Sequence, residues 1–312
     1  MTNATKTLSI IFVVLLVITG IVKISSNPGS SEAFRKKIVQ VDSSKVNKLV
    51  IDRPNNQGNI VLAKNGENWK VQAEGESESY PADADAIKRA IGQVNQLQVK
   101  GVVTHDKDEY TRYKVDSLGT DLKLYNGDQQ LAGVIVGAPQ ILSQREYNTY
   151  VRAEGDQTVY SVNGYLNSTF NRDVNGWRDK TVWKVDKPDI SRIDFLFPAD
   201  SSYSIEKSGS HSWISDNDTL KTTAVGTIVD HLSDLTAKGF VDSTNVDNFG
   251  KELYAVQMQL NNGTQKTLRF RKAAGDDNHY QAVASDYPYV FTVSKYTWDQ
   301  SVFKPRQKLL KN

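Results

Sequence analysis

Hydrophobic and polar residues alternate in short runs along most of the chain, and a pair of such runs opens each half. Residues 46–51 alternate and are followed by 59–64, while residues 190–195 and 203–207 form the second pair. Alternation with a period of two is typical of strands that bury one face. Further strands are expected at 122–125, 131–136, 150–152 and 158–162, and then at 256–260, 267–271, 280–283 and 289–293.

One amphipathic helix is expected in each half. Apolar residues recur there at intervals of three and four, which places them on one helical face. They are Ile87, Ile91, Val94 and Leu97 in the first helix, and Val225, Ile228, Val229, Leu232 and Leu235 in the second. Asp83 or Asp85 is expected to cap the first helix, and Thr222 or Thr223 the second.

Glycine-containing pairs separate the expected strands. They are Asn65-Gly66 and Asn126-Gly127 in the first half, and Ser208-Gly209 and Asn262-Gly263 in the second. Asn-Gly between apolar runs favours a two-residue hairpin with a type I′ turn, in which both central residues need positive φ. Short hairpin connections imply antiparallel pairing.

The two halves follow the same order of expected elements. Segment 96–103 (QLQVKGVV) matches segment 234–241 (DLTAKGFV), because in both an apolar helical pattern runs into Lys-Gly and then a short strand. Gly101 and Gly239 in these segments are expected to end each helix in the left-handed conformation. Trp69 and Trp213 hold equivalent places after the first hairpin of each half. A duplicated packing need explains this match, so both are expected in the core.

These patterns predict an α+β protein with a single N-terminal transmembrane helix and two tandem, homologous domains. Each domain is expected to be mainly antiparallel sheet with one main helix. The expected divisions are a signal anchor at 1–24, a linker at 25–43, a first repeat domain at 44–184 and a second at 185–312. The linker contains the small, polar stretch SSNPGSS, which favours turns.

The expected anchor is the uncharged run 8–22, flanked by Lys6 and Lys23. It is shorter than the ~20 residues that span a bilayer comfortably and overlaps the length of a signal-peptide core. Residues 19–25 lack a good cleavage site, so an uncleaved signal anchor is preferred to a cleaved signal. Basic residues after the run argue against export. A lone apolar segment ahead of a polar, cysteine-free body still favours a single-pass bacterial inner-membrane protein with its body in the periplasm or outside. A cytoplasmic-facing body is the alternative.

Composition narrows the chemistry. The chain has 38 Lys and Arg against 36 Asp and Glu, so its net charge creates no strong positive field that would attract nucleic acid. No nucleic-acid partner is therefore expected. It has no cysteine, which excludes disulfides, thiolate metal sites, a cysteine nucleophile and lipoprotein acylation. Attachment to membrane lipid must therefore come from the N-terminal helix. The basic segment 304–311 is expected to be a solvated C-terminal helix end.

No residue is assigned a catalytic, cofactor-binding or metal-binding role, and no cofactor is expected. The four histidines, His105, His211, His231 and His279, lack the i, i+2 or i, i+4 spacing of a local metal site. His231 is expected at the surface or boundary of the second helix. Acidic clusters at 106–109, 216–218 and 276–278 lack the spacing of a calcium loop and are expected to be solvated loop acids.

The other tryptophans are Trp177, Trp183 and Trp298, which lie toward the ends of the two halves. Packing is preferred for them over lining a sugar-binding or partner-binding face. The chain contains no Gly-x-Ser-x-Gly elbow, Walker loop or Rossmann fingerprint.

With these residues in order, the chain resembles the bacterial domain-of-unknown-function family 4340. The resemblance rests on segment 64–69 (Lys-x-Gly-x-x-Trp), the strand 150–152 (Tyr-Val-Arg), the strand 159–162 (Val-Tyr-x-Val) and the segment 178–180 (Arg-Asp-Lys). It covers about 44–310. Two segments depart from the family pattern, 113–118 and 280–282. The resemblance implies no established activity; some relatives are encoded beside ABC-type transporters, which implies an accessory role in the envelope.

Two functions from different classes follow. The first is a non-enzymatic, membrane-anchored envelope protein that acts as an accessory or scaffold and binds a membrane partner such as an ABC-type transporter complex. The alternative is a protein that binds or hydrolyses cell-wall polysaccharide through a groove between the domains.

Overall fold

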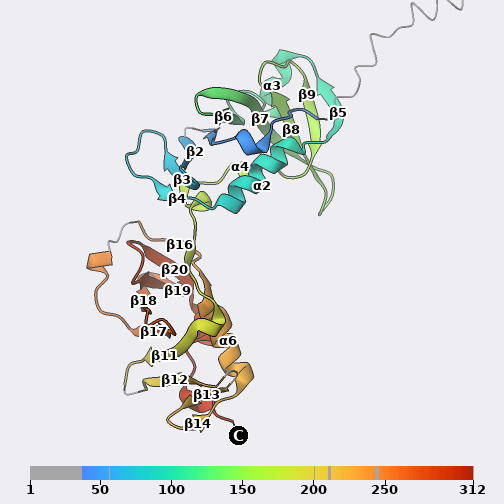
Figure 1. Ribbon diagram of the computed structural model, residues 1–312. Helices are drawn as coiled ribbons and strands as arrows, with labels where there is room; N and C mark the ends of the chain where they lie inside the picture. Colours follow the sequence, from blue (N-terminus) through green and yellow to red (C-terminus); the bar gives the residue numbers. More distant parts are fainter. Residues whose placement is uncertain (1–36, 56, 200, 210–211, 243–245, 312) are drawn as a thin grey trace, which may run out of the picture. The chain divides into compact units, whose positions relative to one another are not determined.

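The computed structural model describes residues 37–55, 57–199, 201–209, 212–242 and 246–311 (Figure 1). The chain divides into two compact units, one ending at Trp177 and the other starting at Arg178. No helix within the described ranges is both long and apolar enough to cross a bilayer. The expected anchor at 1–24 lies outside the described residues, as does most of the expected linker.

The first unit is built on an antiparallel sheet. Within the described residues the sheet has nine strands in the order β4-β3-β2-β1-β6-β7-β8-β9-β5. The strands are β1 (Lys48–Asp52), β2 (Asn59–Asn65), β3 (Asn68–Ala73), β4 (Tyr80–Pro81), β5 (Val99–Thr104), β6 (Thr120–Asn126), β7 (Gln129–Ile141), β8 (Tyr147–Ala153) and β9 (Val159–Asn163). The helices are α2 (Ala84–Asn95), α3 (Tyr110–Tyr113), α4 (Asn167–Phe170) and α5 (Val174–Trp177), with 3-10 turns η1 (Ser43–Lys45) and η2 (Lys107–Glu109).

The second unit repeats this order of strands. Its large sheet runs β14-β13-β12-β11-β17-β18-β19-β20-β16, and β10 pairs separately with β15. The strands are β10 (Thr181–Lys184), β11 (Ile190–Leu196), β12 (Tyr203–Ser208), β13 (Ser212–Ser215), β14 (Asp218–Thr219), β15 (Asp234–Thr236), β16 (Gly239–Phe240), β17 (Tyr254–Leu260), β18 (Gln265–Ala273), β19 (Asp276–Ala284) and β20 (Val290–Ser294). The helices are α6 (Thr222–Ser233) and α7 (Lys295–Ser301), with η3 (Lys187–Asp189), η4 (Val246–Asn248) and η5 (Arg306–Lys308). Two large antiparallel sheets with few helices confirm the expected α+β class.

Each unit buries one face of its sheet under its main helix. In the first unit the buried face of α2 packs with residues of β1, β2 and β6, as the helical spacing predicted (Figure 1). In the second, the predicted residues Val225, Ile228, Val229 and Leu232 of α6 are buried with β11, β12 and β17. Leu235, also expected on this helix, is buried but lies in β15. Trp69 and Trp213 are buried in these two cores, which confirms their packing role.

The helix ends follow the sequence signals only in part. Asp83 caps α2, because its carboxylate accepts a hydrogen bond from the Ala86 amide at 2.8 Å. The expected threonine cap of the second helix is wrong: α6 begins at Thr222 itself, and its N-cap is Lys221, which makes no side-chain capping bond. The expected glycine caps are wrong as well. Both helices end earlier, so Gly101 lies in β5 and Gly239 in β16, neither with positive φ.

The hairpin turns differ in type from the expectation. Asn65 pairs with Asn68 and Asn126 with Gln129, so Gly66 and Gly127 are the first central residues of their turns. Both glycines have positive φ, and the residues after them do not, which is the pattern of a type II′ turn. A type I′ pattern occurs instead at 216–217, between β13 and β14, where both residues have positive φ.

The boundary between the units falls earlier than the expected one after residue 184. Strand β10 pairs with β15, and the Ala237 amide donates to the Lys180 carbonyl, so residues 178–184 belong to the second unit. The basic C-terminal segment is not a solvated helix end. Leu309 is fully buried, and the Lys221 amide donates to its carbonyl at 2.7 Å.

Candidate functional site

A connected set of polar side chains lies on the outer face of the large sheet of the second unit. Along β11, Ile193 and Phe195 point into the core, while Arg192 and Asp194 alternate with them and stay partly exposed. Period-two alternation places these two polar side chains on the same face. The paired strand β12 contributes Ser204 and Glu206 opposite them. We call Arg192, Asp194, Ser204 and Glu206 the Arg192 network.

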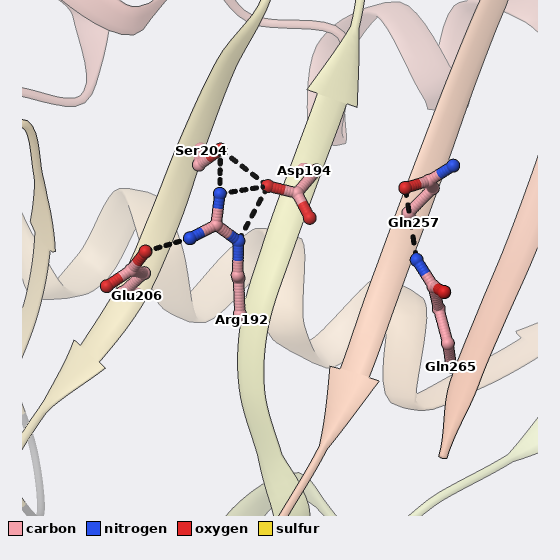
Figure 2. A network of polar contacts seen from close by, with 6 residues as sticks. All are labelled: Arg192, Asp194, Ser204, Glu206, Gln257 and Gln265. Carbon is pink, nitrogen blue, oxygen red and sulfur yellow. Dashed lines mark hydrogen bonds and ion pairs between the residues drawn. The ribbon is translucent and has the colours of Figure 1, made fainter. Parts of the chain in front are cut away.

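Arg192 is the centre of this network (Figure 2). Its Nε donates to Asp194 Oδ1 at 2.8 Å, and its Nη2 donates to Ser204 Oγ at 2.8 Å. Its Nη1 forms an ion pair with Glu206, and the Ser204 hydroxyl donates to Asp194. The guanidinium is therefore held in one orientation by groups on two adjacent strands.

The electrostatics of the network favour its charged form. The hydrogen bond to Asp194 raises the pKa of Arg192 further above its ordinary value, against a smaller opposing effect of burial. The Arg192 side chain keeps 38 % of its exposure and that of Glu206 keeps 49 %, so solvent screens the pairs and each is worth at most about 1 kcal/mol. With one cation and two carboxylates, the network carries a local excess of negative charge.

The same face continues across β17 and β18. Gln265 Nε2 donates to Gln257 Oε1 at 3.1 Å, beside the Arg192 network (Figure 2). Farther along, Arg271 donates to the Phe249 carbonyl and to Gln281 Oε1. Phe249 is buried with Val283 and Val290, so the segment carrying η4 covers that end of the face. The end with the Arg192 network carries the exposed polar groups.

Three of the four corresponding positions of the first sheet are chemically different. In the shared strand order, β1 and β2 hold the places of β11 and β12, and their register sets Val50 against Val61 where Asp194 faces Ser204. Ala63 likewise stands where the second sheet has Glu206. Lys48 stands at the Arg192 position and forms an ion pair with Asp128 at 3.7 Å. On β6 of the same sheet, Lys123 pairs with Asp121 at 3.2 Å, and burial raises the pKa of Asp121. The charged network thus distinguishes the second unit from the first.

The histidines lie apart from this network. His105 contacts Thr158 Oγ1 at 3.1 Å, and His279 contacts Asp276 Oδ2 at 2.7 Å. His231 lies on α6 at the boundary of the core, edge-on to Trp298 with ring centroids 4.9 Å apart, and burial lowers its pKa. His211 lies outside the described residues. Among those that are described, no three His, Asp or Glu side chains are grouped so as to hold a metal ion.

The acidic clusters order local backbone. Asp106 accepts from the Asp108 amide at the start of η2, and Asp276 accepts from the Asn278 amide at the start of β19. The hydrogen bond from the Asn278 amide and that from the His279 side chain lower the pKa of Asp276. Asp216 lies in the turn between β13 and β14, Asp218 follows this turn, and both form ion pairs with Arg306. They hold the C-terminal segment against the second unit.

The three remaining tryptophans are buried, which confirms that they pack in the cores and excludes them from lining a binding face. Trp177 is in the core of the first unit, and Trp183 and Trp298 are in that of the second. Trp183 also donates its Nε1–H to the Leu232 carbonyl at 2.6 Å.

A shallow groove runs along the exposed side of α2, with a volume of about 680 Å³. Lys88, Arg89 and Arg172 supply positive charge there. Each arginine also has an internal partner: Arg89 lies 3.9 Å from Asp83, and the Arg172 guanidinium lies over the Trp177 ring. The groove therefore has cations but no buried polar group that points to a particular ligand.

Sequence reasoning did not single out the Arg192 network. The sequence contains part of the signal for this network. Arg192 and Asp194 are two residues apart in a strand, so they place opposite charges on the same face of the sheet. The meeting with Ser204 and Glu206 depends on the pairing of β11 with β12, and the alternation of either strand alone does not set that register.

Comparison with known proteins gives one match. A search of curated proteins and a search of solved structures each found nothing similar. A family model described as Domain of unknown function (DUF4340) matches residues 75–252, which is more than half of the chain and reaches into both units. The chain therefore belongs to the family of this domain of unknown function, as the order of its short motifs suggested.

Proposed function

We propose that this protein is a non-enzymatic scaffold of the bacterial cell envelope. It is anchored by residues 8–22 as a single-pass protein of the inner membrane, with its body in the periplasm, and it binds a membrane protein partner such as an ABC-type transporter complex. The apolar N-terminal run of the sequence supports the anchor. The Arg192 network supports the binding role.

The observation that carries the binding role is the pre-ordered charged surface on the second sheet. Arg192 is held by three neighbouring side chains while still partly exposed, so little side-chain entropy is lost when a partner covers it. Arginine is enriched among the residues that dominate protein interfaces. The excess carboxylate favours a partner surface with hydrogen-bond donors or basic side chains.

We further propose that the two units are homologous and arose by duplication. Their shared strand order, the placement of one main helix over each sheet and the equivalent Trp69 and Trp213 all support this. After a duplication, one copy can keep only the structural role while the other copy acquires a binding surface. The replacement of Val50, Val61 and Ala63 by charged or polar groups in the second unit fits that history.

Site-specific photo-crosslinking of the full chain in intact cells tests the binding role. A photoreactive residue at Gln257, next to the network, should crosslink to a membrane protein, because it lies on the proposed interface. Lys70, an exposed residue of β3 in the first unit, is the matched control and should give no such product. Combining the Gln257 probe with Arg192→Glu should reduce the crosslink at least fivefold. An equal yield at both positions, or one unaffected by Arg192→Glu, contradicts the proposal.

A further inference from the structure

Exposed apolar side chains gather at the free end of the β7–β8 hairpin. Three of the seven large apolar residues that are exposed in the described part of the chain lie here: Ile141, Leu142 and Tyr165, at 72 %, 47 % and 47 % exposure. Ile141 pairs across the hairpin with Tyr147, whose ring lies 5.7 Å from that of Tyr165. We call Ile141, Leu142, Tyr147 and Tyr165 the apolar tip. A contiguous exposed apolar patch marks an interaction site more often than scattered single residues do.

The backbone of the apolar tip is internally hydrogen-bonded. The amides of Leu142 and Ser143 donate to the Glu146 carbonyl at 3.0 and 3.2 Å, and the Gly164 amide donates to the Tyr147 carbonyl at 2.8 Å. The Tyr147 hydroxyl donates to the Gln144 carbonyl. Because polar backbone groups are costly to bring into an apolar medium without partners, a closed hairpin is suited to enter one.

The chain enters the described structure at the same end of the sheet. Lys37 forms a bridge with Gln98, just before β5 begins at Val99. Val99 pairs with Val162, and the next residue of β9, Asn163, pairs with Asn148, which in turn pairs with Gln140. Lys37 therefore lies about four strand spacings, or ~19 Å, from Gln140, the residue before the tip. Figure 1 shows β8, β9 and β5 together in this unit.

The length of chain before Lys37 is compatible with a common membrane contact. Residues 23–36 connect the apolar run 8–22 to Lys37 and reach at most about 50 Å when fully extended. If residues 8–22 lie in a bilayer, the connection joins this unit at the tip side of the sheet, so the tip is within reach of the bilayer surface.

We propose that the apolar tip lies in the interface of the same lipid bilayer that holds residues 8–22. This rests on the proposed function in one respect, the N-terminal anchor. Ile141 and Leu142 supply the aliphatic surface that buries at the acyl boundary, and the two tyrosines have the apolar ring and polar end that favour membrane interfaces. Arg145 and Glu146 beside them keep their charges at headgroup level.

A lipid surface fits the apolar tip better than a second protein does. Four side chains cover far less than the roughly 800 Å² per partner of a stable protein interface. A weak membrane contact is sufficient, because a tethered group experiences a high effective concentration of its target. The tip then fixes which side of the first unit faces the membrane.

Single-cysteine fluorescence tests this proposal on the full chain in lipid vesicles. The chain has no cysteine, so Leu142→Cys gives one labelling site for an environment-sensitive NBD dye. Asp128→Cys is the matched control, because Asp128 is fully exposed at the opposite end of β7, about 40 Å away. Vesicles of phosphatidylethanolamine and phosphatidylglycerol are used, with and without nitroxide-labelled acyl chains.

The dye at residue 142 should emit at shorter wavelength than the dye at residue 128, and aqueous iodide should quench its fluorescence at least threefold less. Nitroxide-labelled lipid should quench the fluorescence of the dye at residue 142. A second variant carries the dye at Tyr165→Cys together with Leu142→Asp. The added charge should keep the tip out of the bilayer, so the emission wavelength and the iodide quenching should be those of a dye in water. If the protein floats with the vesicles while residue 142 is as open to iodide as residue 128, the tip proposal is wrong and the anchor stands. If the protein does not float with vesicles, both are wrong.

Discussion

Arg178, the first residue of the second unit, is its most unusual side chain. The side chain is 1 % exposed, and its guanidinium lies 3.5 Å from the centre of the Phe240 ring and 4.9 Å from that of Tyr289. Its Nη1 also forms an ion pair with Asp242 at 2.6 Å. A planar guanidinium can stack on rings and pair with a carboxylate together, which a lysine ammonium cannot do. Arg178 thereby connects the start of the unit to β16 and to the residues next to β16 and β20.

Replacing Arg178 should destabilise the second unit. Arg178→Ala removes the buried guanidinium with its ion pair to Asp242 and opens a cavity between two rings, so we expect a loss of about 3 kcal/mol in free energy of unfolding. Arg178→Lys should give a smaller loss, because it keeps the charge but not the stacking. Denaturant titration followed by tryptophan fluorescence measures both. Arg112→Ala, whose side chain is 72 % exposed, is the control and should change stability by less than about 0.5 kcal/mol. A loss for Arg178→Ala no larger than for this control contradicts the assignment.

At the scale of elements, the hairpins and strand ends depend on which glycines need positive φ. Gly127 connects β6 to β7 with φ of +59°, a conformation that a Cβ atom disfavours. Gly101, expected from sequence to be a left-handed helix cap, lies in β5 without positive φ, and an added Cβ there meets nothing within 4 Å. The two glycines therefore have different reasons to be present.

Alanine substitutions separate these roles. Gly127→Ala should lower the free energy of unfolding of the first unit by about 1–2 kcal/mol, because alanine is strained in the left-handed region. Gly101→Ala should leave it unchanged or raise it by up to about 1 kcal/mol, since alanine narrows the unfolded ensemble without strain in the fold. Thermal unfolding of the two variants beside the parent chain decides the matter. A cost at Gly101 equal to that at Gly127 means that Gly101 has a conformational role the structure does not explain.

At the scale of the whole molecule, the boundary between the two units falls between two buried residues. Trp177 is fully buried in the first unit, and the next residue, Arg178, is buried in the second. Residues 178–184 complete the second unit through β10 and the buried Val182 and Trp183. The expected boundary after residue 184 would remove all of these from the unit to which they belong.

Two fragments test this boundary. Residues 178–312 should fold alone and unfold cooperatively, because they carry the complete core of the second unit. Residues 185–312 lack Trp183 and Arg178, and loss of one buried tryptophan typically costs 3–5 kcal/mol, which is enough to unfold a marginally stable unit. Near-ultraviolet circular dichroism and urea titration compare them. Equal stability of the two fragments contradicts the boundary at Trp177.

The sequence by itself determined what short-range periodicity can encode. Alternation and helical spacing predicted the strands, the buried faces of α2 and α6, the Trp69 and Trp213 positions and the α+β class. These features depend on residues within one element, so each element's own pattern carries them. The order of short motifs also indicated the family. Helix ends and turn types were predicted less well, because they depend on where tertiary packing stops a helix or sets a register.

Only the tertiary structure decided which side chains meet. Arg192 contacts Glu206 because β11 and β12 pair in one particular register, and Arg178 stacks on Phe240 and Tyr289 across more than sixty residues of sequence. The apolar tip likewise unites residues of β7, β8 and the segment after β9, and its place at the same end of the sheet as Lys37 follows from the order of strands. Contacts of this kind arise from long-range pairing of backbones, which a local hydrophobic pattern permits but does not specify.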